Sequence, residues 1–298
     1  MNVEELVSAL TLEEKAGLCS GADFWHTKAV ERLGIPAIKV SDGPHGLRTQ
    51  KEGSTDPNDA IEAVCFPAGC AAAASFDPAL TRRMGAALGR EARASGVQVL
   101  LGPAVNIKRS PLCGRNFEYY SEDPLVSGKM AAAMTRGVQA HKGCGTTIKH
   151  YAANNKEYNR YRNNSIVSER AMREIYLKGF GICVREAQPK AVMTSYNLLN
   201  GTHTAESRGL IMDILRAEFG YEGIVMTDWV TPMADTRSAH RDSQAQYVAA
   251  AGGDLFMPGN KGDYDNLLQG IDSGAVSLEQ VKINASRVVR MARALAQE

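Results

Sequence analysis

The feature that most constrains this chain is a repeated alternation of short apolar runs, polar turns and amphipathic segments along its 298 residues. The unit recurs about seven times at a spacing of roughly thirty residues, which is typical of parallel βαβ units. Such a length favours a closed (β/α)8 barrel of the TIM type over an open sheet. No eighth strand is evident between residues 273 and 277. We therefore expect one α/β barrel domain over residues 1–298 that is irregular or one strand short.

Seven segments are predicted as strands because they are apolar and end at turn residues. The weakest of them, 64–75, consists mostly of small residues. Two helices are expected to begin at Asp-Pro pairs, Asp77-Pro78 and Asp123-Pro124, where Asp caps the helix and Pro takes its first position. The predicted strands are residues 35–41, 64–75, 97–101, 145–150, 191–196, 223–227 and 254–257.

Charge and composition exclude several classes of function. Lys plus Arg is 34 and Asp plus Glu is 33, so no global field favours nucleic acid or an anionic membrane. The acidic start lacks the apolar core of a signal peptide, and no apolar run is long enough to span a bilayer. We expect a cytoplasmic protein with no nucleic-acid or membrane partner. The six cysteines form no CxxC pair and are interpreted as buried thiols.

No motif for a cofactor or a metal is found. A GxGxxG fingerprint does not follow the first predicted strand, and a GxxxxGK loop is absent, so no nucleotide cofactor is expected. His141, Cys144 and His150 superficially resemble the spacing of metal ligands, but they lack a fourth partner. We therefore predict no cofactor and no metal site.

Polar residues gather where the predicted strands end. A parallel barrel brings the carboxyl ends of its strands to one mouth, where ligands bind. Carboxylates that accept from paired hydroxyls, cationic donors and an aromatic face together suit a polyhydroxylated ligand. Asp228 follows a strand directly and precedes Trp229, so we predict it to be the reacting group, the alternative being a helix cap or a buried ion-pair partner. The residues at these ends are Asp42, Arg48, Arg115, Glu118, Lys149, His150, Tyr196 and Asp228.

Several of these residues also have a structural interpretation. Asp42 could brace its turn, and Arg115 could form a salt bridge with Glu118 within one loop. Tyr196 and Met193 fit the core as well as a binding site.

Lys149 and His150 are adjacent, so in a regular strand their side chains would point to opposite faces. Both could face the mouth if the peptide bond between them were cis, at a cost of ~3 kcal/mol. We treat this cis bond as a hypothesis.

Four stretches of the sequence resemble glycoside hydrolase family 3, and in particular its β-glucosidase branch. They occur in the family's order and span nearly the whole chain. The matching stretches are Ser41-Asp42-Gly43-Pro44-His45-Gly46-Leu47-Arg48, Gly114-Arg115-Asn116-Phe117-Glu118-Tyr119-Tyr120-Ser121-Glu122-Asp123-Pro124, Lys149-His150-Tyr151-Ala152-Ala153-Asn154-Asn155 and Met226-Thr227-Asp228-Trp229.

This resemblance implies a retaining mechanism in which Asp228 attacks the anomeric carbon and forms a covalent glycosyl-enzyme. Trp229 matches the residue that flanks the nucleophile, and Glu118 matches a residue that would orient Lys149 or Arg115. Met193 is included as a further candidate for the sugar site. The resemblance implies that the glucosyl unit is held by Asp42, Arg48, Arg115, Lys149, His150 and Tyr196.

One departure from the family concerns the second carboxyl group. In two-domain members the acid/base glutamate lies on a second α/β domain, and in single-domain members a His-Asp pair lies on the loop after the Lys-His strand. The corresponding loop here, residues 154–160, contains neither His nor Asp, and its one carboxylate, Glu157, is the alternative candidate for the acid. We therefore expect low activity, and either a second α/β domain or self-association through the barrel mouth.

Three functions remain open from the sequence. The first is a β-glucosidase-like barrel that hydrolyses terminal β-D-glucosyl residues, its ligand a glycoside or glucose. The second is a non-catalytic barrel that binds sugar. The third is an aldolase-type barrel in which Lys149 forms a Schiff base.

Overall fold

Five parallel strands form the centre of the molecule in the order β1-β2-β3-β5-β8. The computed structural model describes residues 1–56, 58–229 and 241–296. Each strand is buried along most of its length, as expected for a sheet with helices on its outer face. The strands are β1 (Val40–Asp42), β2 (Val99–Leu101), β3 (Gly145–Tyr151), β5 (Ala191–Thr194) and β8 (Ile224–Met226).

Two irregular segments close this sheet into a barrel. Leu255 forms a parallel bridge with Met226 of β8, and Phe256 pairs in parallel with Ser20. The chain then turns back as a hairpin over residues 21–27, and the backbone N–H of Val40 in β1 donates to the carbonyl of Trp25 over 2.8 Å. The wall thus consists of five strands, the 254–257 segment and the two arms of the hairpin.

The predicted TIM-type barrel is therefore confirmed, and so is its irregularity. The segment 254–257, predicted as a strand, makes only isolated bridges. The last gap in the wall is filled from the N-terminal part of the chain, and not from residues near 273–277. A hairpin whose arms run antiparallel replaces a regular parallel strand there.

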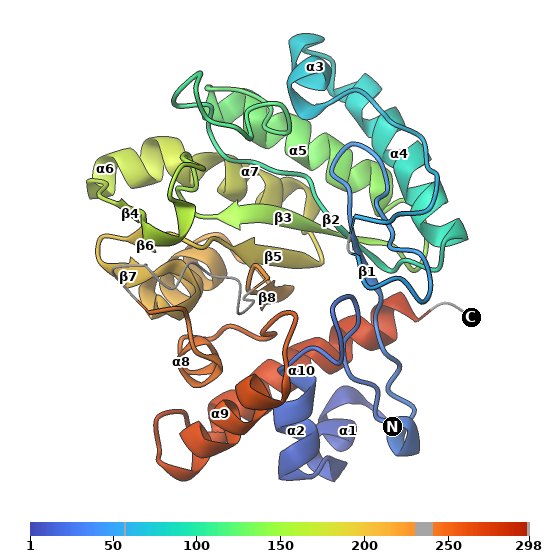
Figure 1. The fold of residues 1–298 in the computed structure, drawn as a ribbon, viewed down its shortest axis with the longest axis vertical. Coiled ribbons are helices and arrows are strands. Elements are labelled where there is room, and N and C mark those ends of the chain that lie inside the picture. Colours follow the sequence, from blue (N-terminus) through green and yellow to red (C-terminus); the bar gives the residue numbers. More distant parts are fainter. Residues whose placement is uncertain (57, 230–240, 297–298) are drawn as a thin grey trace.

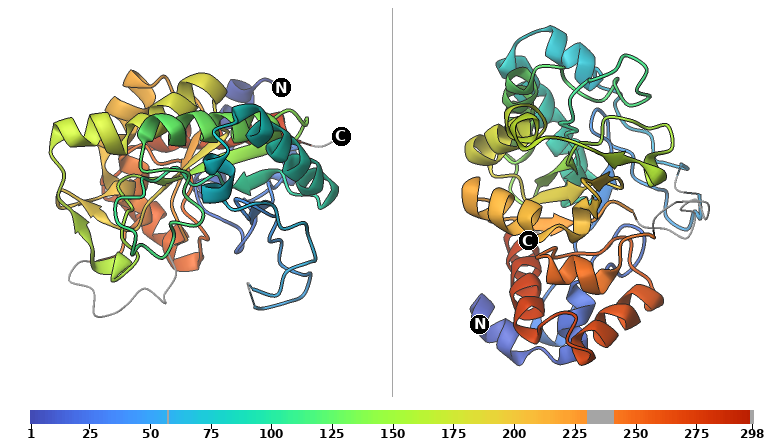
Figure 2. Two further views of the ribbon diagram at one scale, coloured as in Figure 1. Left: turned by 90° about the horizontal axis from the view of Figure 1, so that it is seen from above. Right: turned by 90° about the vertical axis from the view of Figure 1, so that its left-hand side faces the viewer.

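Helices pack around much of the outside of the barrel, and loops and the short strands β4, β6 and β7 lie at its other sides (Figures 1 and 2). In Figure 1, α3 to α7 lie above the sheet, whereas α1, α2, α9 and α10 pack together below it. The α-helices are α1 (Val3–Ala9), α2 (Leu12–Leu18), α3 (Gly69–Ala74), α4 (Pro78–Ala94), α5 (Pro124–Val138), α6 (Glu169–Ala171), α7 (Lys178–Ala187), α8 (Ala245–Ala250), α9 (Lys261–Asp272) and α10 (Leu278–Leu295).

The remaining elements are short or irregular. A small separate sheet, β4 (Asn164–Ser165), β6 (Leu198–Leu199) and β7 (Thr202–His203), lies beside the loop that follows β3. Two π-helices and three 3-10 helices complete the described part of the chain. The π-helices are η3 (Met172–Tyr176) and η5 (Gly209–Glu218), and the 3-10 helices are η1 (Glu31–Leu33), η2 (Arg160–Arg162) and η4 (Thr204–Glu206).

Local sequence explains where most helices begin. The side chain of Asp77 accepts hydrogen bonds from the first N–H groups of α4, and Asp123 does the same for α5, as predicted. The strand predicted over 64–75 is wrong, because α3 forms within it. Its run of alanines lacks β-branched residues, and alanine has the highest intrinsic helix propensity.

Among the described residues, no helix combines the length and the apolar character needed to cross a bilayer.

Candidate active site

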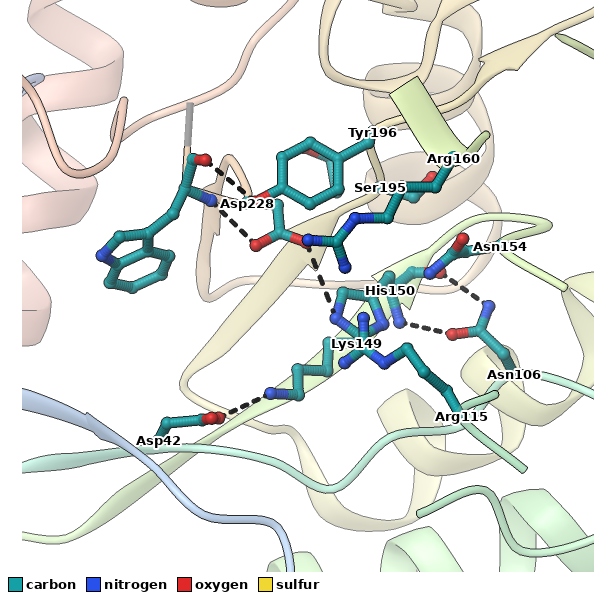
Figure 3. Close-up of polar contacts among 12 residues, drawn as sticks. Asp42, Asn106, Arg115, Lys149, His150, Asn154, Arg160, Ser195, Tyr196 and Asp228 are labelled. Atoms are coloured by element: carbon teal, nitrogen blue, oxygen red, sulfur yellow. Dashed lines mark hydrogen bonds and ion pairs between the residues drawn. The ribbon is translucent and has the colours of Figure 1, made fainter. Parts of the chain in front are cut away.

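A cavity of about 300 Å³ lies at the carboxyl ends of the barrel strands. It contains every residue predicted for the sugar site except Glu118, which contacts the cavity through Arg115. Figure 3 shows the polar side chains converging from β1, β3, β5 and β8. The cavity is lined by Phe24, Trp25, Asp42, Arg48, Asn58, Leu101, Arg115, Lys149, His150, Arg160, Met193, Tyr196, Asp228 and Trp229.

Asp42, at the end of β1, binds two cationic side chains on one wall of the cavity. Its Oδ1 accepts from Lys149 Nζ over 2.8 Å, and its Oδ2 accepts from Arg48 Nη2 over 2.7 Å. Burial alone would raise the pKa of this carboxyl, but Lys149 and Arg48 more than offset it and hold the pKa well below its usual range. Asp42 is therefore an ionised acceptor, and it holds the cationic donors Lys149 and Arg48 beside it.

Lys149 and His150 both line the cavity, although they are neighbours in β3. The peptide bond between them is cis, which agrees with the hypothesis made from the sequence. The side chain of Asn106, on the loop after β2, bonds both backbone groups of His150. Its Nδ2 donates to the His150 carbonyl over 2.9 Å, and its Oδ1 accepts from the His150 N–H over 2.7 Å. The backbone is thus fixed where the two side chains enter the site.

Asp228 follows β8 and faces His150. Its Oδ1 accepts from the N–H of Trp229 over 2.8 Å, and its Oδ2 lies 3.6 Å from His150 Nε2. Burial raises the pKa of Asp228, and the positive charges of Arg115, Lys149 and Arg160 oppose that rise. Among the described residues, no lysine or arginine forms an ion pair with this carboxylate. Its Oδ2 is therefore open toward the cavity.

His150 is held neutral. Burial lowers its pKa well below the usual range, and the nearby charges of Arg115, Lys149 and Arg160 lower it further. A neutral imidazole does not cancel the charge of Asp228. It can donate one hydrogen bond to a hydroxyl or to the carboxylate.

Two arginines border Asp228 from different loops. Arg115 donates from Nε to Glu118, and its Nη1 lies 3.8 Å from Glu157. Arg160 donates from Nη1 to Glu157 over 3.1 Å, and its guanidinium stacks over the ring of Tyr196 at 4.9 Å. The geometry fits the orienting role that we predicted for Glu118 toward Arg115.

Aromatic rings form the rim of the cavity. Trp25 and Trp229 lie with their ring centroids 5.7 Å apart, and Phe24 contacts both. Tyr196 donates from its hydroxyl to the backbone carbonyl of Trp229 over 2.9 Å. Burial, together with the charge of Asp228, raises the pKa of Tyr196 well above its usual range, so the phenol stays protonated. An apolar wall opposite charged donors suits the face of a sugar ring.

Sequence reasoning missed several residues of the cavity. Arg160 lies in the loop after β3, ten residues beyond His150, and no local sequence pattern marks it as part of the site. Phe24 and Trp25 belong to the closing hairpin, which was not predicted. Asn58 and Leu101 are the other missed residues.

The described residues contain no group of three or more His, Cys, Asp or Glu side chains that could hold a metal ion. His141 donates from Nε2 to the carbonyl of Ala86 in α4 over 2.7 Å, so this ring nitrogen is taken up by a backbone group.

The chain belongs to glycoside hydrolase family 3. The family model described as "Glycosyl hydrolase family 3 N terminal domain" matches residues 8–291. This match covers the barrel and every residue of the cavity.

Curated relatives carry several glycosidase names. The chain is 45% identical to a thermostable beta-glucosidase B of Acetivibrio thermocellus, over 98% of this chain and 38% of that protein. It is also 45% identical to an exo-alpha-(1->6)-L-arabinopyranosidase of Bifidobacterium breve, over 92% of this chain and 35% of that protein. The chain therefore spans well under half the length of these relatives.

Solved structures agree with the fold. Beta-glucosidase 3B from Thermotoga neapolitana in complex with glucose superposes with a TM-score of 0.87 at 38% identity, over 97% of this chain and 42% of that one. Beta-glucosidase from Kluyveromyces marxianus in complex with glucose gives a TM-score of 0.89 at 38% identity, over 99% of this chain and 34% of that one.

Proposed function

We propose that this chain is the nucleophile-bearing barrel of a retaining β-glucosidase-type glycoside hydrolase. The observation that carries the proposal is the carboxylate of Asp228. Its side chain is only 13% exposed, it is opposed by a neutral His150, and its Oδ2 points into a cavity of the size of one sugar ring. A structural aspartate in such a place would be neutralised by a cation.

The proposed reaction begins with attack of Asp228 Oδ2 on the anomeric carbon. The bond from that carbon to the leaving oxygen breaks, and a glycosyl ester with Asp228 forms. Water later attacks the same carbon, releases the sugar and restores the carboxylate. Asp42, Lys149 and Arg48 would bind hydroxyls at the far side of the ring, and Trp229 would pack on its apolar face.

The proposed substrate is a terminal β-D-glucosyl unit. The names of the relatives support this class, and glucose is present in the solved structures named above. The arabinopyranosidase at equal identity indicates that the same barrel accepts other pyranosides in relatives.

The leaving oxygen needs a proton unless the leaving group is activated. In retaining enzymes the two carboxyl groups are about 5–5.5 Å apart. Among the described residues that line the cavity, the other carboxylate is Asp42, and Lys149 and Arg48 hold it as an ionised acceptor. We propose that the acid comes from a part of a longer protein, since the relatives extend well beyond the matched region. Alone, the chain should turn over natural glucosides slowly.

A labelling experiment tests the proposal. The chain is incubated with dinitrophenyl 2-deoxy-2-fluoro-β-glucoside, whose leaving group needs no acid, and is examined by mass spectrometry. We expect one fluoroglucosyl adduct on the peptide that carries Asp228, and none in Asp228→Asn. An adduct elsewhere, or no adduct at all, would contradict the proposal.

A sugar-binding barrel without catalysis is the second candidate, favoured by the missing acid. Glucose binding by calorimetry together with absence of the adduct would support it. The aldolase alternative is weakened because Lys149 Nζ donates to Asp42 over 2.8 Å and is not a free amine. Failure of borohydride to trap a carbonyl substrate on Lys149 is the expected result.

A further inference from the structure

Glu157 lies in the loop after β3, and its carboxylate joins two arginines of the cavity. Arg160 Nη1 donates to Oε2 over 3.1 Å, and Arg115 Nη1 lies 3.8 Å from Oε1. The amide of Asn154 donates to Oε1 over 3.4 Å. The Glu157 side chain is only 18% exposed. It does not occur among the described residues that line the cavity.

These contacts bear on the question of the missing acid. A general acid must bring its O–H to within about 2.6–3.2 Å of the leaving oxygen. Both oxygens of Glu157 instead face guanidinium or amide donors. Glu157, the one carboxylate of its loop, therefore binds the two arginines and does not present an O–H to a leaving oxygen.

The arginines in turn link two loops around the nucleophile. Arg115 also donates to Glu118, so acid and base alternate in the order Glu118, Arg115, Glu157 and Arg160. Figure 3 shows the guanidinium groups of Arg115 and Arg160 reaching toward His150 and Asp228. Both positive charges act on the Asp228 carboxyl and oppose the effect of its burial.

We propose that Glu157 is a positioning residue that fixes Arg115 and Arg160 at the distance from Asp228 at which their charges keep the nucleophile in its reactive carboxylate form. The inference rests on the proposed function, because it assigns Glu157 a part in the same reaction. Without Glu157, the positive charges of Arg115 and Arg160 would repel each other, and the two side chains would move apart.

The test is the rate of covalent labelling by dinitrophenyl 2-deoxy-2-fluoro-β-glucoside. Glu157→Gln keeps the shape of the side chain and removes its charge. We expect labelling to slow by about tenfold or more, because a displacement of about 1 Å near the reacting atoms can cost a hundredfold. The matched control is Glu174→Gln, which breaks an Arg–Glu pair of the same length, 3.1 Å, on the exposed surface of η3. Labelling of this control should equal that of the unchanged chain.

The choice of leaving group separates positioning from acid catalysis. If Glu157 were the acid, Glu157→Gln would be labelled by the dinitrophenyl reagent at the normal rate. Hydrolysis of a methyl glucoside would nevertheless fall, and azide would speed turnover of a dinitrophenyl glucoside by attacking the glycosyl ester in place of water. That result, or normal rates with both substrates, would overturn the inference.

A double-mutant cycle checks whether Glu157 acts through its partner. Adding Glu157→Gln to Arg160→Gln should slow labelling far less than it does alone, because part of the interaction is already gone. Independent, multiplicative effects would contradict the inference. Glu157→Asp, which keeps the charge, should recover part of the rate and serves if Glu157→Gln unfolds.

The two proposals fail in distinguishable ways. An unchanged chain that takes no label contradicts the proposed function, and this inference with it. An unchanged chain that is labelled on Asp228, beside a Glu157→Gln variant labelled equally fast, contradicts only the inference.

Discussion

Two aspartates lie near the same strand, Asp254 fully buried and Asp228 with a side chain 13% exposed, and they are partnered in opposite ways. Asp254 lies beside the first half of β8, where its carboxylate accepts from Arg216 over 2.5 Å, from Arg287 over 3.0 Å and from the N–H of Val225 over 2.7 Å. Asp228, beyond the other end of β8, accepts from one N–H and faces a neutral imidazole. Burial raises the pKa of both carboxyls.

The difference shows that burial alone does not mark a reactive group. Asp254 is fully buried with both oxygens saturated, so it can only join elements. Asp228 keeps one oxygen toward a cavity, and its arginines act from a distance. A carboxylate that is desolvated but not ion-paired is a better nucleophile, because its charge is not already satisfied.

The largest effect is expected from Asp228→Asn. Loss of the nucleophile should reduce hydrolysis of a dinitrophenyl glucoside by about a thousandfold or more. The free energy of unfolding should stay unchanged or rise, because a buried charge without a salt bridge has been removed. Steady-state kinetics and urea unfolding of the same preparation measure both. Substantial unfolding by this variant would contradict the contrast between Asp228 and Asp254.

Asp254→Asn should show the reverse pattern. It leaves Arg216 and Arg287 without their carboxylate, and breaking a buried ion pair in this way costs about 3–5 kcal/mol. The urea midpoint should fall accordingly. The rate of labelling of the molecules that remain folded should stay close to that of the unchanged chain, and a selective loss of labelling would argue for a catalytic part.

Asp42→Asn tests a carboxylate of intermediate kind, ion-paired like Asp254 but facing the cavity. Its contacts with Lys149 and Arg48 are charge-assisted hydrogen bonds, worth about 1.5–3 kcal/mol each. We expect the dissociation constant for glucose to rise by about tenfold to a hundredfold. Calorimetry measures it, and an unchanged constant would place the sugar elsewhere.

The smallest effect concerns pH. In the proposed reaction Asp228 attacks as a carboxylate, so labelling should decline as the pH falls through its pKa, which burial raises above the usual 3.8. Arg160 opposes that rise, so Arg160→Gln should move this acidic limb to higher pH, by less than about one unit. A pH profile of the labelling rate checks the sign. A shift to lower pH would contradict the electrostatic role of Arg160.

Local patterns predicted those parts of the molecule that local chemistry determines. The strand ends at Asp42, His150 and Asp228 were evident because an apolar run stops at a polar residue in each case. Asp77 and Asp123 indicated where α4 and α5 begin, because each caps its helix. The extent of the single domain over residues 1–298 stays a prediction, as do the roles assigned to the site residues.

What the sequence did not reveal depends on contacts between distant segments. The partners of Asp254 come from η5 and α10, and only the folded chain brings them together. The pairing of Glu157 with Arg115 likewise joins two loops. The strand predicted at 64–75 failed for a different reason, since apolarity alone does not separate a buried helix from a strand.

The hairpin over residues 21–27 has a consequence for how the molecule can be assembled. It is the seam of the barrel, joining an early segment to Phe256, and it also supplies Phe24 and Trp25 to the cavity. The cavity is therefore complete only once residues 21–27 pack against the segment that contains Phe256, even if the central strands form earlier. Trimming this chain from its first residues should open the cavity before it loosens the sheet.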